Sequence, residues 1–249
     1  MVIHVARETY QAGETVVALV DGIETPGRVA LVRVERKPGC ETAVLVDEQC
    51  LGEPYGVVEL TLPRCALPTA EGSECALSHA VQVRANGLVA QARLEVSAKA
   101  RAHLALGYSG RGPLIAGWDA RHFHLELDDA ELHGGGWIAG RVHRDGPWRS
   151  RTIVVRCRCD ECWRPDGPVA CGGPYWHGHT LWAAEEVIHP DPGTSWMPLR
   201  FDLPPDLPPA VEARTIAWRY EMRARLRRNH WPDETAALTP LLYDERADA

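Results

Sequence analysis

Several sequence patterns are missing from this 249-residue chain, and each missing pattern excludes a class of protein. No apolar run approaches the roughly 18 residues of a membrane-spanning helix. The first eight residues lack the basic start and apolar block of a secretory signal, so we expect a cytoplasmic protein with reduced cysteines. The net charge of −7 lacks the basic excess that general nucleic-acid binding or anionic-membrane binding requires.

Enzyme motifs are missing as well. The glycine-rich stretches at 110–112 and 134–136 are not followed by Gly-Lys-Ser/Thr, so they do not predict a phosphate-binding loop. The chain also has no Gly-x-Ser-x-Gly nucleophile elbow. We therefore expect a protein without enzymatic activity.

Tryptophan is absent from the first 117 residues, whereas nine tryptophans occur from Trp118 onward. At roughly 100–150 residues per domain, the chain is long enough for two domains. The imbalance is compatible with two unrelated domains or with two diverged copies of one domain.

Apolar residues recur mainly with a period of two, which is typical of β-strands. Strands are predicted at 15–20, 28–36, 57–62, 81–85, 88–96, 123–127, 136–142, 152–159, 199–203 and 216–226. The last run is the clearest, because Trp218, Tyr220, Met222, Ala224 and Leu226 alternate with charged residues. No segment has a 3.6-residue apolar stripe, so we expect an all-β fold built from antiparallel β-sandwiches.

An internal repeat divides the chain. The matched segments, in the same order in both halves, are 13–20 with 135–142, 32–36 with 155–159, 60–68 with 201–208, and 81–85 with 220–224. Glycines cluster between the copies. We expect an amino-terminal β-sandwich at 1–103, a linker at 104–117, a second β-sandwich at 118–232 and an acidic tail at 233–249. A Trp-rich stretch around Trp163, Trp176 and Trp182 is expected to be an insertion that the first copy lacks.

Two motifs resemble the arrestin-like family. One is Tyr-x-x-Gly-Glu-x-Val-x-Ala from Tyr10 to Ala18, and the other is the Leu-Pro-Thr-Ala-Glu-Gly crossover at 67–72. The resemblance implies two tandem arrestin-like (immunoglobulin-like) β-sandwich domains and a role as a protein-interaction scaffold or adaptor. The second crossover, at 203–209, lacks the Ser/Thr and Glu-Gly of this motif.

A row of arginines on the last predicted strand is the candidate partner-binding site. Its members are Arg219, Arg223, Arg225 and Arg227. Guanidinium groups suit carboxylates and phosphates, and the arrestin resemblance implies an acidic or phosphorylated protein segment as the partner. A solvated outer sheet face is the alternative. The tail acids could also fold back onto a basic edge after Leu241-Leu242-Tyr243.

A cluster of cysteines and histidines is the candidate metal site. Cys159 and Cys162 have the Cys-x2-Cys spacing of a zinc knuckle, which Cys171 and His177 could complete. His179 and Cys157 are alternative ligands, and ordinary reduced thiols are the alternative interpretation. A structural zinc ion would stabilise this region. The competing functional hypothesis is a zinc-dependent enzyme or a zinc-stabilised binding module centred on 157–179.

Overall fold

The computed structural model describes residues 1–23, 26–97, 123–131, 133–144, 148, 152–165, 176–227, 234–238 and 243–244. All regular secondary structure in these ranges is β-strand, and most strand pairs are antiparallel, which confirms the all-β prediction. The predicted linker at 104–117 lies outside the described residues. Within the described ranges, no helix is long and apolar enough to cross a membrane.

The amino-terminal part, residues 1–97, contains two sheets with the orders β1-β3-β6 and β2-β9-β8-β4-β5, and β7 pairs with β8. Its strands are β1 (Val2–Val5), β2 (Thr9–Tyr10), β3 (Thr15–Asp21), β4 (Gly27–Lys37), β5 (Cys40–Leu51), β6 (Tyr55–Thr61), β7 (Ala70–Glu71), β8 (Ala76–Ala85) and β9 (Leu88–Val96). The long strand β5 is an edge strand, with a register irregularity opposite Leu31 and Val32.

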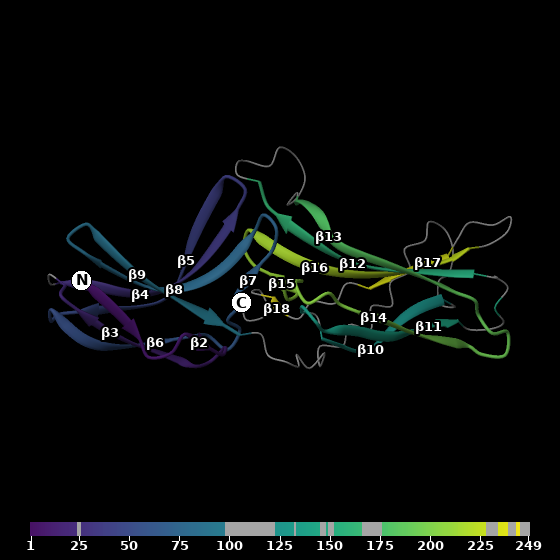
Figure 1. The fold of residues 1–249 in the computed structure, drawn as a ribbon, viewed down its shortest axis with the longest axis horizontal. Coiled ribbons are helices and arrows are strands. Elements are labelled where there is room, and N and C mark those ends of the chain that lie inside the picture. The colour runs from purple at the N-terminus through teal and green to yellow at the C-terminus, as the bar shows by residue number, and fades with distance from the viewer. Residues whose placement is uncertain are drawn as a thin grey trace.

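The carboxy-terminal part, from residue 123 onward, contains sheets with the orders β10-β11-β14 and β13-β12-β16-β15-β18, and β17 pairs with β16. Its strands are β10 (Phe123–Glu131), β11 (Trp137–Arg144), β12 (Thr152–Trp163), β13 (His177–Ile188), β14 (Trp196–Asp202), β15 (Val211–Glu212), β16 (Ile216–Arg227), β17 (Glu234–Leu238) and β18 (Tyr243–Asp244). The tail segment β18 pairs in parallel with β15, close to where the two parts of the molecule meet (Figure 1).

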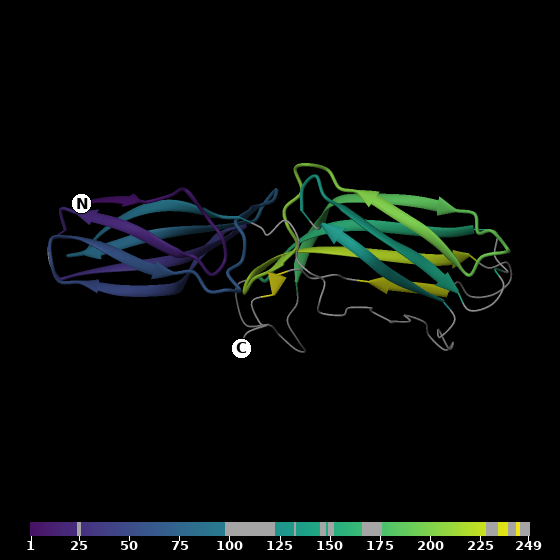
Figure 2. The ribbon, with the colours of Figure 1, turned by 90° about the horizontal axis from the view of Figure 1, so that it is seen from below.

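Each part has its own apolar core, and each core draws on both of its sheets. In the amino-terminal part, Val16 and Leu60 pack with Leu31 and Val81 of the other sheet. In the carboxy-terminal part, residues of β11 and β14 pack with residues of β12 and β16. The predicted apolar face of β16 is confirmed, because its five members are at most 1% exposed. Figure 2 shows the two parts end to end along the long axis.

A third, smaller core joins the two parts. It combines Leu67, Ala70, Cys75 and Leu77 from the amino-terminal part with Val211, Ala213, Ile216 and Trp218 from the carboxy-terminal part. These residues lie in or beside two hairpins, β7–β8 and β15–β16. Trp218 is fully buried here, so the face of β16 that fills the carboxy-terminal core also reaches the contact between the parts.

Corresponding strands occupy corresponding positions in the two parts. The central strand β4 pairs with β5 and β8, as β12 pairs with β13 and β16. The Trp-rich stretch after Trp163 is therefore not wholly an insertion, because it contains β13, the counterpart of β5. The extra length lies in the connection at 164–176, whereas Pro38-Gly39 alone turns β4 into β5. Gly39 has a φ of 75°, which suits the tight turn.

Candidate functional site

A row of arginines lies on the outer face of β12 and β16. The two strands pair without a register shift from Thr152 opposite Arg227 to Trp163 opposite Ile216. Because side chains alternate between the faces of a strand and Cys157 and Met222 lie in the core, the residues between the core positions face outward. The outward-facing arginines are Arg156, Arg158, Arg219, Arg223, Arg225 and Arg227.

Two of these arginines face each other across the ladder. Arg156 of β12 is directly opposite Arg223 of β16, and both are exposed. Like charges directly opposite each other disfavour a strand pair by roughly 0.2–1 kcal/mol. Within the part of the chain that the structure describes, Arg156 forms no ion pair. A pair that opposes folding and remains accessible is a candidate for binding.

Acidic side chains balance the arginines nearer to β15. Arg219 forms an ion pair with Glu212 at 3.0 Å, and Arg158 Nε donates to Glu221 Oε2 at 2.7 Å. Arg223 Nη2 also contacts Glu221, at 2.7 Å. On the other side of β12, Glu185 of β13 lies opposite Arg156. We call the four arginines at the end of the row farther from β15 the basic face: Arg156, Arg223, Arg225 and Arg227.

The basic face includes three of the four arginines predicted from the sequence and adds Arg156. The sequence pattern of β16 could not show Arg156, because the two strands lie far apart along the chain. The signal that could have found it is the alternation of Arg156 and Arg158 with cysteines on a predicted strand. Guanidinium groups spaced along neighbouring strands can bind several carboxylates or phosphates of one extended segment.

The predicted zinc ligands are distributed over both faces of the second large sheet. Residues 159–162 lie within β12 and are extended, so Cys159 and Cys162 project to opposite faces. Cys159 is fully buried in the core. His177 and His179 are opposite Trp163 and Glu161 in the ladder. Cys171 lies outside the described residues.

Burial also affects the thiols of β12. It raises the pKa of Cys157 and of Cys159 to about 12, although a hydrogen bond with Tyr220 opposes the effect at Cys159. Both thiols lie in the apolar core of the carboxy-terminal part, which makes them poorly placed to bind zinc. Burial also raises the pKa of Cys162, but Cys162, His177 and His179 line one hollow of about 260 Å³. Within the described ranges, no three His, Cys, Asp or Glu side chains are placed to hold a metal ion.

The end of β12 instead carries a buried carboxylate that contacts the amino-terminal part. Glu161 is 0% exposed. The backbone N–H groups of Glu74 and Cys75 both donate to it at 3.0 Å. Ser73 Oγ donates at 2.8 Å and Trp218 Nε1 at 3.2 Å. Glu161 therefore caps the turn of the β7–β8 hairpin.

His179 lies beside this carboxylate, but the group does not form a catalytic triad. His179 Nε2 is 2.8 Å from Ser73 Oγ and 3.4 Å from Glu161 Oε2. A nucleophile–base–acid relay uses both ring nitrogens, one for the serine and one for the acid. Here the same nitrogen faces both oxygens, so the arrangement cannot pass a proton through the ring.

A matching contact runs in the opposite direction. Glu35 of β4 is also 0% exposed, and it accepts hydrogen bonds from Thr215 N at 2.8 Å and Thr215 Oγ1 at 2.6 Å. Thr215 lies in the turn of the β15–β16 hairpin. Each part therefore inserts a carboxylate from its central strand into a hairpin turn of the other part. We call Glu35, Glu161 and the two turns the reciprocal clasp.

Two more contacts support the clasp. Arg33 Nη2 donates to Glu35 Oε1 at 2.8 Å, and Lys37 Nζ donates to the carbonyl oxygen of Arg164 at 2.6 Å. Glu35 does not stand out in the sequence, because it occupies a polar position in the alternation of its strand. Glu161 could have been noticed, because it continues the buried face of Val155, Cys157 and Cys159, where an apolar residue is expected. No protein-family model matches the chain, and its sequence matches no curated protein significantly.

Proposed function

We propose that this chain is a non-enzymatic, arrestin-like interaction scaffold made of two tandem antiparallel β-sandwich domains. Its partner is an acidic or phosphorylated protein segment that binds the basic face. The Arg156–Arg223 pair carries the proposal, because an exposed like-charge pair weakens the sheet and becomes favourable when an anion bridges it.

Three further features support the fold part of the proposal. Each part has two sheets with one apolar core between them. The strand order around β4 corresponds to that around β12. The sequence segments that repeat lie on these corresponding strands. The reciprocal clasp would hold the two domains in one orientation, as a scaffold that presents a fixed surface requires.

A binding experiment with two labelled peptides tests the proposed function. The probes are a fluorescein-labelled serine-rich peptide and the same peptide carrying two phosphoserines, followed by fluorescence anisotropy. We expect the phosphorylated probe to bind, with an affinity that falls as the salt concentration rises. The double variant Arg156→Gln/Arg223→Gln should weaken binding by at least tenfold.

The amino-terminal part offers a matched control. Arg28 and Arg84 are also exposed and directly opposite each other, and Arg28 has an acidic partner, Glu48, as Arg223 has Glu221. Arg28→Gln/Arg84→Gln removes the same charge and should leave binding within about twofold of the unmodified protein. Equal losses in both double variants would show that only net charge matters and would contradict the basic face.

A zinc-stabilised module is the second candidate function. Cys162, His177 and His179 line one hollow but are not placed to hold a metal ion by themselves, so this candidate needs a further ligand such as Cys171, which lies outside the described residues. Stoichiometric zinc in protein purified without a histidine tag would support it. Cys162→Ser should then lose the metal. Cys159→Ala should retain it, because Cys159 faces the core. A metal-free protein would rule this candidate out.

A further inference from the structure

A hollow of about 260 Å³ lies where the turn between β4 and β5 of the amino-terminal part meets the end of β12. Its described lining residues come from both parts of the molecule and none of them is acidic: Lys37, Pro38, Trp163, Arg164, Pro165 and His177. No arginine of the basic face lines this hollow. It is therefore a second place on the molecule where an anion could bind.

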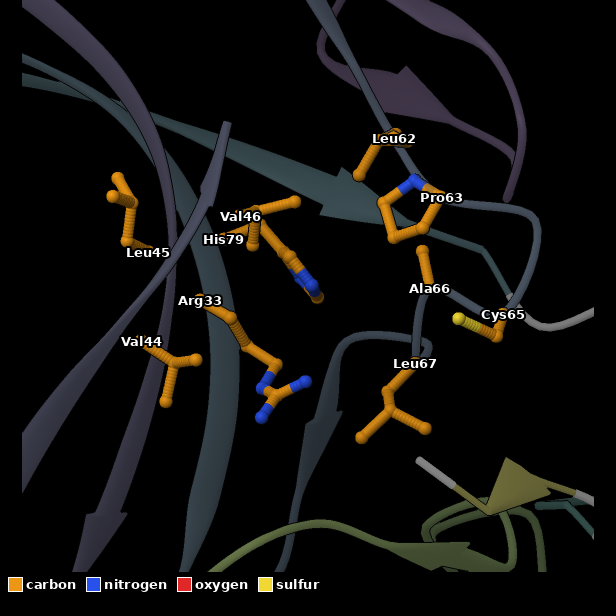
Figure 3. Close-up of a pocket in the computed structure, with 10 residues that line it drawn as sticks. All are labelled: Arg33, Val44, Leu45, Val46, Leu62, Pro63, Cys65, Ala66, Leu67 and His79. Atoms are coloured by element: carbon orange, nitrogen blue, oxygen red, sulfur yellow. The ribbon is translucent and has the colours of Figure 1, made fainter. Parts of the chain in front are cut away.

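The arginine of this hollow differs from the arginine of the pocket in the amino-terminal part, which Figure 3 shows. There, Arg33 Nη2 donates to the buried carboxylate of Glu35 at 2.8 Å, so its charge is balanced. Within the part of the chain that the structure describes, Arg164 forms no ion pair, and its buried Nε has no hydrogen-bond partner. Buried polar atoms are nearly always paired, with protein, water or a ligand. The Nε donor of Arg164 therefore lacks an acceptor that a bound anion would supply.

Neighbouring groups hold Arg164 in place without using its side-chain donors. Lys37 Nζ donates to the carbonyl oxygen of Arg164 at 2.6 Å, and the backbone N–H of Arg164 donates to the carbonyl oxygen of Thr215 at 2.8 Å. The central carbon of the guanidinium group lies 4.7 Å from the centre of the Trp176 ring. Such stacking uses the flat face of the group, whereas its N–H donors lie in its plane and stay available. Two neighbouring donors of this plane match the two oxygens of a carboxylate.

The rest of the lining suits a flat ring. Trp163 is partly buried against the core that joins the two parts. The ring of His177 is stacked beside it, with the ring planes 21° apart and the ring centres 6.5 Å apart. Aromatic rings favour stacked and edge-to-face partners, and Pro38 and Pro165 add rigid apolar surface. An apolar cavity of about 150 Å³ accommodates benzene, so about 260 Å³ has room for two fused rings and a carboxylate.

We propose that this hollow binds a small carboxylic acid with a planar aromatic body. The carboxylate accepts hydrogen bonds from Nε and one terminal nitrogen of Arg164, and the aromatic body packs against Trp163 and the two prolines. The proposal does not rest on the proposed function, because the basic face takes no part in the hollow.

Indole-3-carboxylate is the probe that tests the proposal, with indole-3-carboxamide as an uncharged probe of the same shape. The full chain is first dialysed against EDTA, so that a metal ion at the histidines cannot bind the carboxylate. Each probe is then titrated in at pH 7 and followed by NMR. We expect indole-3-carboxylate to bind with a dissociation constant of about 1 mM or tighter and indole-3-carboxamide to bind about tenfold more weakly or worse. Equal binding of the two probes, or no binding of indole-3-carboxylate at 20-fold higher concentration, would overturn the proposal.

Two arginine variants localise the binding. Arg164→Gln should weaken indole-3-carboxylate binding by about tenfold or more, because it removes the paired donors. Arg214→Gln is the matched control, since Arg214 is exposed, precedes the Thr215 turn and does not line the hollow. It removes the same charge and should leave binding nearly unchanged. Equal losses in the two variants would show that only net charge matters and would reject the site.

Folding of Arg164→Gln is checked by circular dichroism, and unchanged binding in the folded variant would also reject the site. If this variant is unfolded, Arg164→Lys replaces it. Lysine keeps the charge but lacks the planar pair of donors, so binding should weaken by about threefold or more, and unchanged binding would again reject the site. Binding of the phosphorylated peptide to the basic face should be the same in the arginine variant that is used. A loss of both ligands would show one shared anion site and overturn the separate hollow.

Discussion

Removing the carboxylate of Glu161 should destabilise the molecule strongly, because this group satisfies donors that water cannot reach. In Glu161→Ala, the backbone N–H of Cys75 and Nε1 of Trp218 lose their acceptor, and both residues are at most 1% exposed. Each buried donor left without a partner costs about 1–3 kcal/mol. Ser73 and Glu74 are exposed and can turn to water. The expected loss in the free energy of unfolding is therefore about 4 kcal/mol.

Urea unfolding measures this loss, with tryptophan fluorescence reporting on the carboxy-terminal part and far-UV circular dichroism reporting on the whole chain. Glu186→Ala is the matched control, because Glu186 is an exposed glutamate on the neighbouring strand β13 and lies opposite the apolar Val155. Its unfolding free energy should stay within about 0.5 kcal/mol of the unmodified protein.

The reasoning fails if Glu161→Ala loses less than about 1 kcal/mol, since the two buried donors would then have other partners. The clasp can also be tested as a unit. If Glu35 and Glu161 together hold the two parts, the loss in Glu35→Ala/Glu161→Ala should differ from the sum of the single losses by more than about 0.5 kcal/mol. Additive losses would show two independent contacts.

Three further predictions concern other parts of the molecule. Gly72→Ala should reduce the unfolding free energy by about 1–3 kcal/mol, because a Cβ there would collide with the Glu161 carboxylate. Urea titrations should show a smaller loss when Gly72→Ala is made in the Glu161→Ala variant. An equal loss with and without the carboxylate would contradict this cause. Burial lowers the pKa of His79 from 6.5 to about 4 in the folded protein. Between pH 4 and pH 6.5, the unfolded chain therefore binds a proton that the folded chain does not bind. The free energy of unfolding should therefore fall by about 3 kcal/mol in total as the pH falls from 6.5 to 4. Denaturant titrations across this pH range should show a weaker pH dependence for His79→Gln. The same pH dependence in His79→Gln and in the unmodified protein would contradict the prediction. Thiol labelling at pH 8 should modify the exposed Cys50 before the other described thiols. Cys75, Cys157 and Cys159 are buried, and burial raises their pKa values to about 12, so they should react only after unfolding. Mass spectrometry of peptides locates the modified thiols, and early labelling of Cys157 would contradict the prediction by showing that β12 opens in the folded protein.

Strands with a regular apolar alternation were predictable from the sequence, including the edge strands β6, β10 and β14, whereas two long edge strands rich in polar residues were not. The alternation on β16 identified both its buried face and its charged face, because the apolar residues fill every second position. The edge strands β5 and β13 escaped prediction. Edge strands contact a neighbour on one side only, so polar residues such as Glu41 and Glu185 interrupt their apolar pattern.

The candidate sites depend on contacts between distant segments, which local patterns do not show. The spacing of Cys159 and Cys162 predicted a knuckle, but this spacing is also compatible with a continuous strand, where the two thiols face opposite sides. Arg156 meets Arg223, and Glu161 meets the turn after β7, only through sheet pairing and the packing of the two parts. The sequence indicated that the row of arginines on β16 faces outward, and the pairing of β12 with β16 showed that Arg156 lies opposite Arg223.

Photo-crosslinking tests most directly whether the basic face binds the partner. A peptide with two phosphoserines and one photoreactive residue between them is irradiated with the full chain, and the crosslinked residues are located by mass spectrometry. The proposed scaffold predicts crosslinks on β12 and β16 around Arg156 and Arg223, and their loss in Arg156→Gln/Arg223→Gln. Crosslinks confined to the amino-terminal part, or unchanged in the double variant, would contradict it.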